Sequence, residues 1–325
     1  MALPFVKGMP VQRRQLGSTP FEVAPLALGG NVFGWTADEA TSFRLLDAFV
    51  AMGGNLIDTA DAYSRWVPGH QGGESESIIG RWIAQRGHHR DVVIATKVGS
   101  DMGEGNRVLR KDYILRRVED SLRRLHVESI DLYQSHWDDE NTPLEETLEA
   151  YAQLLRDGKI RAIGASNLSA PRLAHALAVS ARTGLPRYAV LQPHYNLYER
   201  SSFEGPLQDL CVKEGVGVIP YYSLASGFLT GKYRSPADFA KSKRGGGMQK
   251  FLNERGHAIL DALANWAERL SVTPAQIALA WLMTRPAVVA PIASATSLEQ
   301  LEEIMGSLAV VLPTDALRAL DAAST

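Results

Sequence analysis

The chain has 325 residues, of which 45% are hydrophobic and 22% are charged, and its formal net charge at pH 7 is −2. This composition is typical of a globular protein with a large core, and the small net charge provides no field that would favour nucleic acid or an anionic membrane. No apolar run reaches the roughly 18 residues that span a bilayer, and a single cysteine, Cys211, excludes an internal disulfide and a cysteine-rich metal site.

The first predicted element is a β-hairpin over residues 13–23. Alternating residues flank a Gly17-Ser18 turn, and Pro20 occupies a position that an edge strand tolerates. Residues 1–7 lack the apolar core and the small-residue cleavage site of a signal peptide, so we expect a cytoplasmic protein.

Short apolar runs alternate with helical patterns along the rest of the chain. The predicted strands are residues 26–30, 55–58, 92–97, 130–135, 160–165, 189–192, 216–221 and 288–291. The predicted helices begin near residue 37 and then cover residues 74–85, 111–125, 144–156, 169–182, 201–214, 256–270 and 297–306. A last amphipathic helix is predicted over 313–323. The stretch 234–254 combines Lys241, Lys243 and Arg244 with a run of glycines, which favours a mobile loop after the seventh strand.

The strand runs are apolar throughout rather than alternating, as expected of parallel strands that are buried on both faces. Eight strand–helix units predict a single-domain α/β protein over residues 1–325, a closed (β/α)8 TIM barrel with an N-terminal hairpin and an extra C-terminal helix. A doubly wound sheet of the same units is the alternative. In the barrel, the hairpin would plug the end away from the predicted chemistry.

Four ionisable residues follow successive predicted strands, namely Asp58, Tyr63, Lys97 and His136. In a barrel their side chains would converge at the C-terminal mouth, where barrel enzymes keep their chemistry. A carboxylate, a phenol, an amine and an imidazole suit proton transfer to a carbonyl oxygen better than they suit a metal, so no metal site is predicted. The Lys97 ammonium would lower the pKa of Tyr63, and Asp58 would hold Lys97 in place. Each residue alone also has an ordinary role in a turn, a cap or a barrel wall.

This pattern resembles the catalytic Asp, Tyr, Lys and His of the aldo-keto reductases. The resemblance rests on residues 57–64 (IDTADAYS), 96–98 (TKV), 135–136 (SH), 164–167 (GASN), 191–196 (LQPHYN), 224–233 (LASGFLTGKY) and 294–303. It implies a barrel that binds a nicotinamide dinucleotide at its mouth and transfers hydride to an aldehyde or ketone. By the same resemblance Tyr63 is the proton donor, Lys97 and Asp58 tune it, and His136 orients the carbonyl.

No G-x-G-x-x-G motif follows a strand, so a Rossmann cofactor site is not expected. The resemblance implies that Ser166, Asn167 and Gln192 hold the nicotinamide carboxamide and that Tyr221 stacks on its ring. Residues 224–232 would lie along the pyrophosphate, and the helix that begins near Thr296 would meet the adenosine. The residues expected to contact the cofactor are Gly30, Asn31, Asp58, Ser166, Asn167, Gln192, Tyr221, Ser223, Leu224, Ser226, Lys232, Ser294, Thr296, Gln300 and Glu303.

The adenosine end departs from the family pattern. No lysine or arginine occurs between Pro286 and Leu317, and Ile304 stands where many relatives have an asparagine that contacts adenine. A 2′-phosphate there lacks its usual cationic partner. Either the basic stretch 241–244 supplies the charge, or NADH is usable. The resemblance favours NADPH.

The predicted substrate residues are Phe33, Trp35, Tyr63, His136 and Trp137, an aromatic wall that would exclude water from the carbonyl. We expect a fairly open site for varied small aldehydes and ketones, with neither nucleic acid nor a membrane as partner; the oligomeric state stays open. Channel-associated relatives make a nicotinamide-binding regulatory or sensor subunit the main alternative. A metal-dependent hydrolase is disfavoured, because the first strands carry no His-x-His pair and a lysine lies beside the acid.

Overall fold

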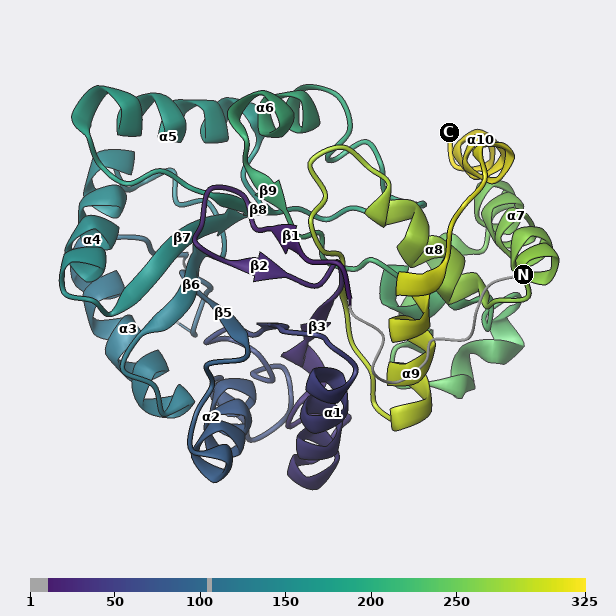
Figure 1. The fold of residues 1–325 in the computed structure, drawn as a ribbon, viewed down its shortest axis with the longest axis horizontal. Coiled ribbons are helices and arrows are strands. Elements are labelled where there is room, and N and C mark those ends of the chain that lie inside the picture. Colours follow the sequence, from purple (N-terminus) through teal and green to yellow (C-terminus); the bar gives the residue numbers. More distant parts are fainter. Residues whose placement is uncertain (1–10, 104–106) are drawn as a thin grey trace.

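Eight parallel strands form the centre of the molecule in the computed structural model, which describes residues 11–103 and 107–325 (Figure 1). They are β3 (Ala27–Gly29), β4 (Leu56–Asp58), β5 (Val93–Val98), β6 (Ile130–Ser135), β7 (Ile160–Ser166), β8 (Val190–Gln192), β9 (Gly217–Val218) and β10 (Ile292–Ala293), hydrogen-bonded in the order β10-β3-β4-β5-β6-β7-β8-β9. Backbone hydrogen bonds also close the gap between β9 and β10: Val289 N–H donates to Val218 O at 2.8 Å, and Ile292 N–H donates to Pro220 O at 2.9 Å. The chain is therefore a (β/α)8 barrel, and the doubly wound alternative is wrong.

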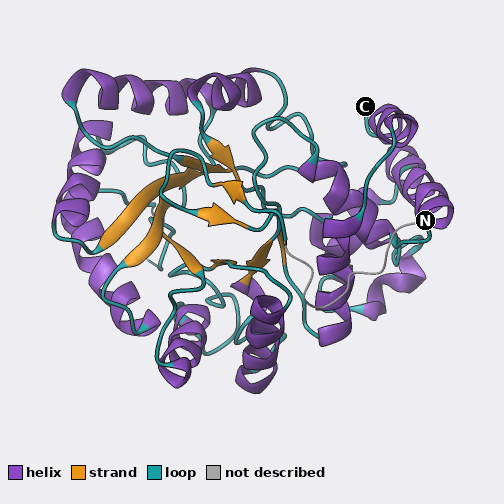
Figure 2. Cartoon of the chain, viewed as in Figure 1, coloured by secondary structure: helices purple, strands orange, loops and turns teal. Residues whose placement is uncertain are grey.

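Helices surround the strands on the outside (Figure 2). They are α1 (Glu39–Ala51), α2 (Glu74–Arg86), α3 (Lys111–Leu125), α4 (Leu144–Arg156), α5 (Ala170–Thr183), α6 (Pro206–Glu214), α7 (Glu254–Leu270), α8 (Pro274–Met283), α9 (Leu298–Gly306) and α10 (Thr314–Ala323). None of the helices in the described ranges combines the length and the apolar character that crossing a bilayer requires.

Helix α8 was not predicted from the sequence. Seven of its residues are buried, from Ala275 to Leu282, so it has no polar face and no amphipathic stripe. Its N-terminal signal was present: Thr273 and Gln276 form a reciprocal capping box around Pro274.

The predicted hairpin consists of β1 (Arg14–Gln15) and β2 (Glu22–Val23), and Figure 1 shows it lying across the centre of the strands. Leu16, Phe21 and Val23 are buried among the inward-facing side chains of the barrel. Gly17 has φ +55°, and a Cβ atom there would lie 2.0 Å from the carbonyl oxygen of Ala189. The hairpin therefore plugs the end of the barrel away from the mouth.

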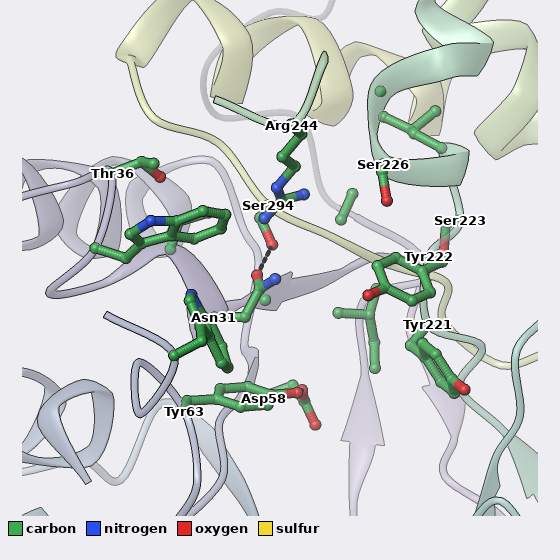
Figure 3. A pocket seen from close by; sticks show the side chains of 18 of the residues that line it. Asn31, Thr36, Asp58, Tyr63, Tyr221, Tyr222, Ser223, Ser226, Arg244 and Ser294 are labelled. Carbon is green, nitrogen blue, oxygen red and sulfur yellow. Dashed lines mark hydrogen bonds between the residues drawn. The ribbon is translucent and has the colours of Figure 1, made fainter. Parts of the chain in front are cut away.

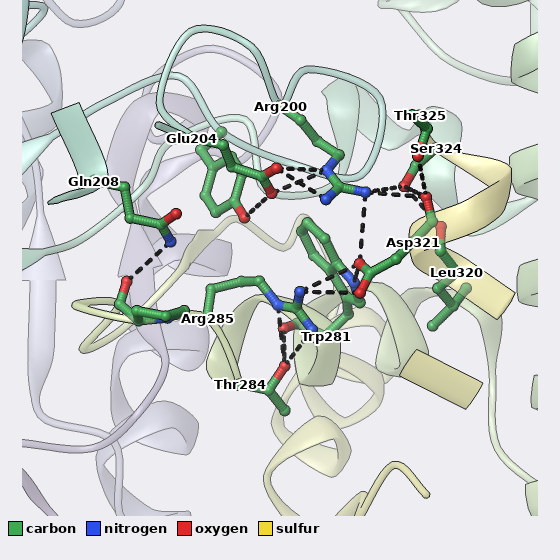
Figure 4. Close-up of polar contacts among 12 residues, drawn as sticks. Arg200, Glu204, Gln208, Trp281, Thr284, Arg285, Leu320, Asp321, Ser324 and Thr325 are labelled. Carbon is green, nitrogen blue, oxygen red and sulfur yellow. Dashed lines mark hydrogen bonds and ion pairs between the residues drawn. The ribbon is translucent and has the colours of Figure 1, made fainter. Parts of the chain in front are cut away.

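The C-terminal helix α10 packs against α7 and is fixed by a polar network (Figure 4). Asp321 accepts hydrogen bonds from Trp281 Nε1 at 2.9 Å and from Arg285 Nη1 at 3.2 Å, and it pairs with Arg200 Nη1 at 3.5 Å. Arg200 also binds Glu204, so one cluster joins α8, α10 and the segment after β8. The predicted extra helix at the C-terminus is therefore present, and it lies to the side of the barrel.

The stretch 234–254 contains three short 3-10 helices, η3 (Pro236–Lys241), η4 (Gly245–Gly247) and η5 (Gln249–Phe251). Met248 and Phe251 are buried against the core. Its mobility stays a prediction.

Candidate active site

The ends of β4 and β5 bring an acid and an amine together inside the barrel mouth. Lys97 is fully buried, and its Nζ donates to Asp58 Oδ2 at 2.8 Å, to Tyr63 Oη at 2.9 Å and to the Thr59 carbonyl oxygen at 2.7 Å. These three acceptors match the three N–H donors of an ammonium group. Burial lowers the pKa of Lys97, and the Asp58 carboxylate opposes that shift. The geometry therefore fixes one lysine directly against the phenol.

Tyr63 borders the cavity and lies at the centre of this arrangement. Its hydroxyl donates to Asp58 Oδ2 at 3.1 Å and accepts from Lys97. Burial and the neighbouring Asp58 carboxylate raise the pKa of Tyr63 well above its usual value. The expected net lowering of the pKa of Tyr63 is not found, because burial and the carboxylate dominate. Tyr63 is consequently a neutral phenol that carries a proton.

His136 follows β6 and faces Tyr63, with 6.1 Å between the ring centroids. Its Nδ1 lies 2.8 Å from Ser100 Oγ, and its ring stacks on Trp137 at 5.9 Å. Burial, with added repulsion from Lys97 and Arg107, holds the pKa of His136 well below its usual value. The ring is therefore neutral. A hydrogen bond that Ser100 donates to Nδ1 would leave the ring proton on Nε2.

A cavity of about 1190 Å³ opens at this mouth (Figure 3). That volume is ample for a nucleotide cofactor together with a small molecule. The residues of the sequence prediction that line it are Asn31, Trp35, Asp58, Tyr63, His136, Trp137, Ser166, Asn167, Gln192, Tyr221, Ser223, Leu224, Ser226, Lys232, Ser294, Thr296, Gln300 and Glu303. The structure thus collects nearly all the predicted site residues around one space.

Three predicted residues do not line the cavity: Lys97, which contacts Asp58 and Tyr63 as described above, Gly30 and Phe33. Gly30 is buried in the 3-10 turn η1 (Gly30–Val32), where its carbonyl oxygen accepts a hydrogen bond from Ser75 Oγ at 2.8 Å. Phe33 is fully buried and packs in the core instead of forming part of the substrate wall. Neither Gly30 nor Phe33 reaches the cavity, so the structure does not support the cofactor role predicted for Gly30 or the substrate role predicted for Phe33.

One hydrogen-bond network connects the acid to the far wall of the cavity. Gln192 Nε2 donates to Asp58 Oδ1 at 2.9 Å, and the backbone carbonyl of Gln192 accepts from Ser166 Oγ at 2.7 Å. Asn167 Nδ2 donates to Ser166 Oγ at 3.0 Å, and Tyr221 donates to Asn167 Oδ1 at 2.8 Å. These amides and hydroxyls are held in fixed orientations at the ends of β7, β8 and β9.

The stretch 234–254 and the residues just before it contribute several cations to the cavity. Its lining includes Lys232, Lys241, Lys243 and Arg244, together with Thr296, Gln300 and Glu303 near the N-terminus of α9. The side chain of Arg244 points into the cavity, as Figure 3 shows, and its guanidinium carbon lies 5.2 Å from the centroid of the Trp35 ring. Arg244 Nη2 is buried and has no hydrogen-bond partner in the described part of the chain. The basic stretch therefore lines the same cavity as α9, which has no cation of its own.

Several lining residues were missed in the sequence, among them Arg65, Trp66, Ser100, Arg107 and Tyr222. Trp66 is half exposed and makes edge contacts with the rings of Trp35 and Tyr63, at centroid distances of 5.6 and 6.1 Å. These residues lie in loops or just beyond strands, where no hydrophobic period marks which side chains face inward. Only Tyr222, next to the predicted Tyr221, carried a usable signal.

The chain matches the family model "Aldo/keto reductase family" over residues 25–325. It is 35% identical to the uncharacterized oxidoreductase YrpG of Bacillus subtilis, over 94% of both chains. It is 31% identical to norsolorinic acid reductase of Aspergillus flavus, over 94% of this chain and 78% of that protein. It is 30% identical to a probable voltage-gated potassium channel subunit beta of Arabidopsis thaliana, over 93% and 92%. These matches support an oxidoreductase with a nicotinamide cofactor. The chain belongs to the aldo/keto reductase family.

Proposed function

We propose that the protein reduces aldehydes or ketones to alcohols, with a reduced nicotinamide dinucleotide as cofactor and Tyr63 as proton donor. The observation that carries this proposal is the Tyr63 hydroxyl, which borders the cavity and lies 2.9 Å from Lys97 Nζ and 3.1 Å from Asp58 Oδ2. The bound dinucleotide would supply the hydride.

Each member of the group then has a distinct task. Tyr63 gives its proton to the carbonyl oxygen while the carbonyl carbon receives the hydride, so that the C=O group becomes CH–OH. The Lys97 ammonium stabilises the phenolate that is left, because the opposite charges lie in hydrogen-bond contact. Asp58 balances the charge of Lys97 and fixes its position. His136 donates from Nε2 to the same carbonyl oxygen and so orients it.

Besides its volume, the cavity has backbone and side-chain groups that suit the pyrophosphate of a dinucleotide. In η2 (Ala225–Thr230), Ser226 and Gly227 have φ of 58° and 96°, a left-handed stretch of the kind that turns successive backbone N–H groups toward an anion. Lys232 lies at the end of this turn and lines the same space. These groups suit the pyrophosphate.

We further propose that NADPH is preferred over NADH. The support is the position of Lys241, Lys243 and Arg244, which line the cavity together with Gln300 of α9. The buried, unpartnered Nη2 of Arg244 is the kind of donor that a 2′-phosphate would satisfy.

Cofactor preference is tested by kcat/KM with NADPH and with NADH. Arg244→Gln should reduce the NADPH:NADH ratio by about 10-fold or more, the size of one lost charged hydrogen bond. Arg234→Gln is the matched control, since Arg234 belongs to the same stretch but pairs with Asp261 and does not line the cavity. Equal kcat/KM for both cofactors in the unaltered protein would contradict the preference.

The reaction itself is tested with benzaldehyde by loss of reduced-nicotinamide absorbance. Tyr63→Phe should lower kcat by about 10² to 10⁴, the usual contribution of a proton donor, while cofactor binding measured by fluorescence is retained. Tyr222→Phe is the matched control, because Tyr222 lines the same cavity and lies outside the Lys97–Asp58 group. If both variants keep full turnover, Tyr63 is not the proton donor.

A nicotinamide-binding regulatory or sensor subunit is the second candidate, and the likeness to a named potassium channel subunit favours it. In that case the protein would bind the cofactor tightly and turn over a panel of aldehydes and ketones poorly. Titration followed by the same absorbance assay separates the two functions.

A further inference from the structure

Two arginines border the part of the cavity that contains Tyr63 and His136. Arg65 lies in the loop just after Tyr63, and its Nη1 donates to the carbonyl oxygen of Asp101 at 3.0 Å. Arg107 precedes α3, and its guanidinium carbon lies 4.0 Å from the centroid of the Trp137 ring. Trp137 in turn stacks on His136. Both guanidinium groups are thus held beside the residues proposed to meet the carbonyl.

Among the described residues that line this end, the arginines outnumber the carboxylates that are not already paired with Lys97. Across residues 11–103 and 107–325, neither guanidinium lies within ion-pair distance of a carboxylate. Asp58 is paired with Lys97, and Glu303 lies on α9. Asp101 is the other acidic residue of the lining, and its carboxylate accepts from the Gly103 N–H at 2.8 Å. An arginine stacked on an indole keeps its N–H edge available for a planar anion.

The walls between these arginines and the phenol are flat and aromatic. Trp35, Trp66 and Trp137 line the same space, and the edge contact between Trp35 and Trp66 leaves their two rings nearly perpendicular, at 85°. Such walls bury planar conjugated molecules well. The tryptophans therefore favour flat molecules, and the two arginines favour molecules that carry a negative charge.

We propose that the preferred substrate is an aromatic aldehyde or ketone that carries a carboxylate or another anionic group, and that Arg107 and Arg65 bind this anion. The inference rests on the proposed carbonyl reduction and specifies its substrate class. The aromatic ring packs against the tryptophans, the carbonyl oxygen meets Tyr63 and His136, and the anion lies at the guanidinium rim. Both arginines act as binding residues, so replacing them should raise KM for the anionic substrate and leave kcat nearly unchanged.

The test compares 3- and 4-carboxybenzaldehyde with their methyl esters, which keep the ring and the aldehyde but remove the charge. The unaltered protein should show a kcat/KM about 10- to 100-fold higher for at least one acid than for its ester, the size of a charged hydrogen bond. This preference should shrink as salt is added, since a partly exposed ion pair is screened. Arg107→Gln should raise KM far more for the acid than for the ester and so remove most of the preference. Arg65→Gln should do so in part.

Arg110→Gln is the matched control, because Arg110 is exposed, pairs with Asp112 and does not line the cavity. Turnover of the esters with no preference for the acids overturns the inference and leaves the proposed reduction intact. An equal loss for acid and ester in Arg107→Gln also overturns it, because the arginine would then only hold the loop. If neither acid nor ester is reduced while the cofactor binds, the proposed function and the inference both fail.

Discussion

Asp61 is a buried carboxylate whose removal should stabilise the protein at neutral and alkaline pH. It lies in the loop after β4 and is fully buried, and neither carboxylate oxygen has a hydrogen-bond partner in the described part of the chain. The nearest cation is Arg117, whose Nη2 is 3.5 Å from Oδ2. Burial is the main cause that raises the pKa of Asp61 to about 7, and repulsion from Glu76 is the second cause. The charged form is therefore disfavoured in the folded state.

The size of the effect follows from the two protonation equilibria. An aspartate in the unfolded chain has a pKa of about 3.9, so the displacement to about 7 corresponds to roughly 4 kcal/mol when both states are fully ionised. The folded state binds this proton more tightly than the unfolded state does, so the contribution to stability falls as pH rises from about 4 through 7. Between pH 5 and pH 8 the expected loss is about 2–3 kcal/mol.

Asp61→Asn keeps the shape of the side chain and removes the titration. The free energy of unfolding is measured in urea at several pH values. The difference between the variant and the unaltered protein should shift in favour of the variant by about 2–3 kcal/mol as the pH rises from 5 to 8. Asp120→Asn is the matched control, because it removes the other carboxylate that pairs with Arg117, from a more exposed position. The reasoning is refuted if the free energies of unfolding of Asp61→Asn and the unaltered protein follow the same pH dependence.

Three further predictions concern the plug, the C-terminal helix and the imidazole. Gly17→Ala should lower the free energy of unfolding by about 2 kcal/mol or more and lower Tm, because at φ +55° the new methyl group would lie 2.0 Å from the Ala189 carbonyl oxygen. An unchanged Tm would show that the hairpin shifts freely. Asp321→Ala should lower the free energy of unfolding by about 1–3 kcal/mol, since it leaves the Trp281 N–H without its acceptor. Hydrogen exchange in α10 should become faster, and exchange as slow as in the unaltered protein would contradict this role of Asp321. Because the pKa of His136 is held well below its usual value, kcat/KM should show no step near pH 6.5; a step there that vanishes in His136→Asn would contradict the neutral ring.

The strands could be predicted because each is a short apolar run buried on both faces. Their closure into a barrel could not be read from any one run, since it depends on the pairing of Val218 with Val288, residues far apart in the chain. Helix α8 was missed because burial all round leaves no periodic pattern, although the capping box of Thr273 marks its start. Local patterns thus predict the units, and long-range register decides how they join.

The four ionisable residues were predictable because parallel strands place their C-terminal ends together, whatever the loops do. The orientation of Gly30 and Phe33 was not, since a single 3-10 turn decides it. Arg65, Trp66 and Arg107 lie in loops whose inward side no hydrophobic period reveals. The rim of the cavity, which decides which carbonyl compounds fit, is accordingly the part that required coordinates.

The N-terminal plug also constrains how the chain is made. Arg14 Nη1 donates to the carbonyl oxygens of Met283 and Val288, and Gly17 lies against Ala189 and Gly217, so the hairpin depends on residues that are synthesised much later. A nascent fragment that ends before Met283 lacks the carbonyl groups that Arg14 binds, and it also lacks Val289 and Ile292, which belong to the same buried cluster as Leu16 and Phe21. Synthesis of the segment that contains β10 is then the step after which the barrel can close, and a chaperone that shields the hairpin until that point would raise the yield of folded protein.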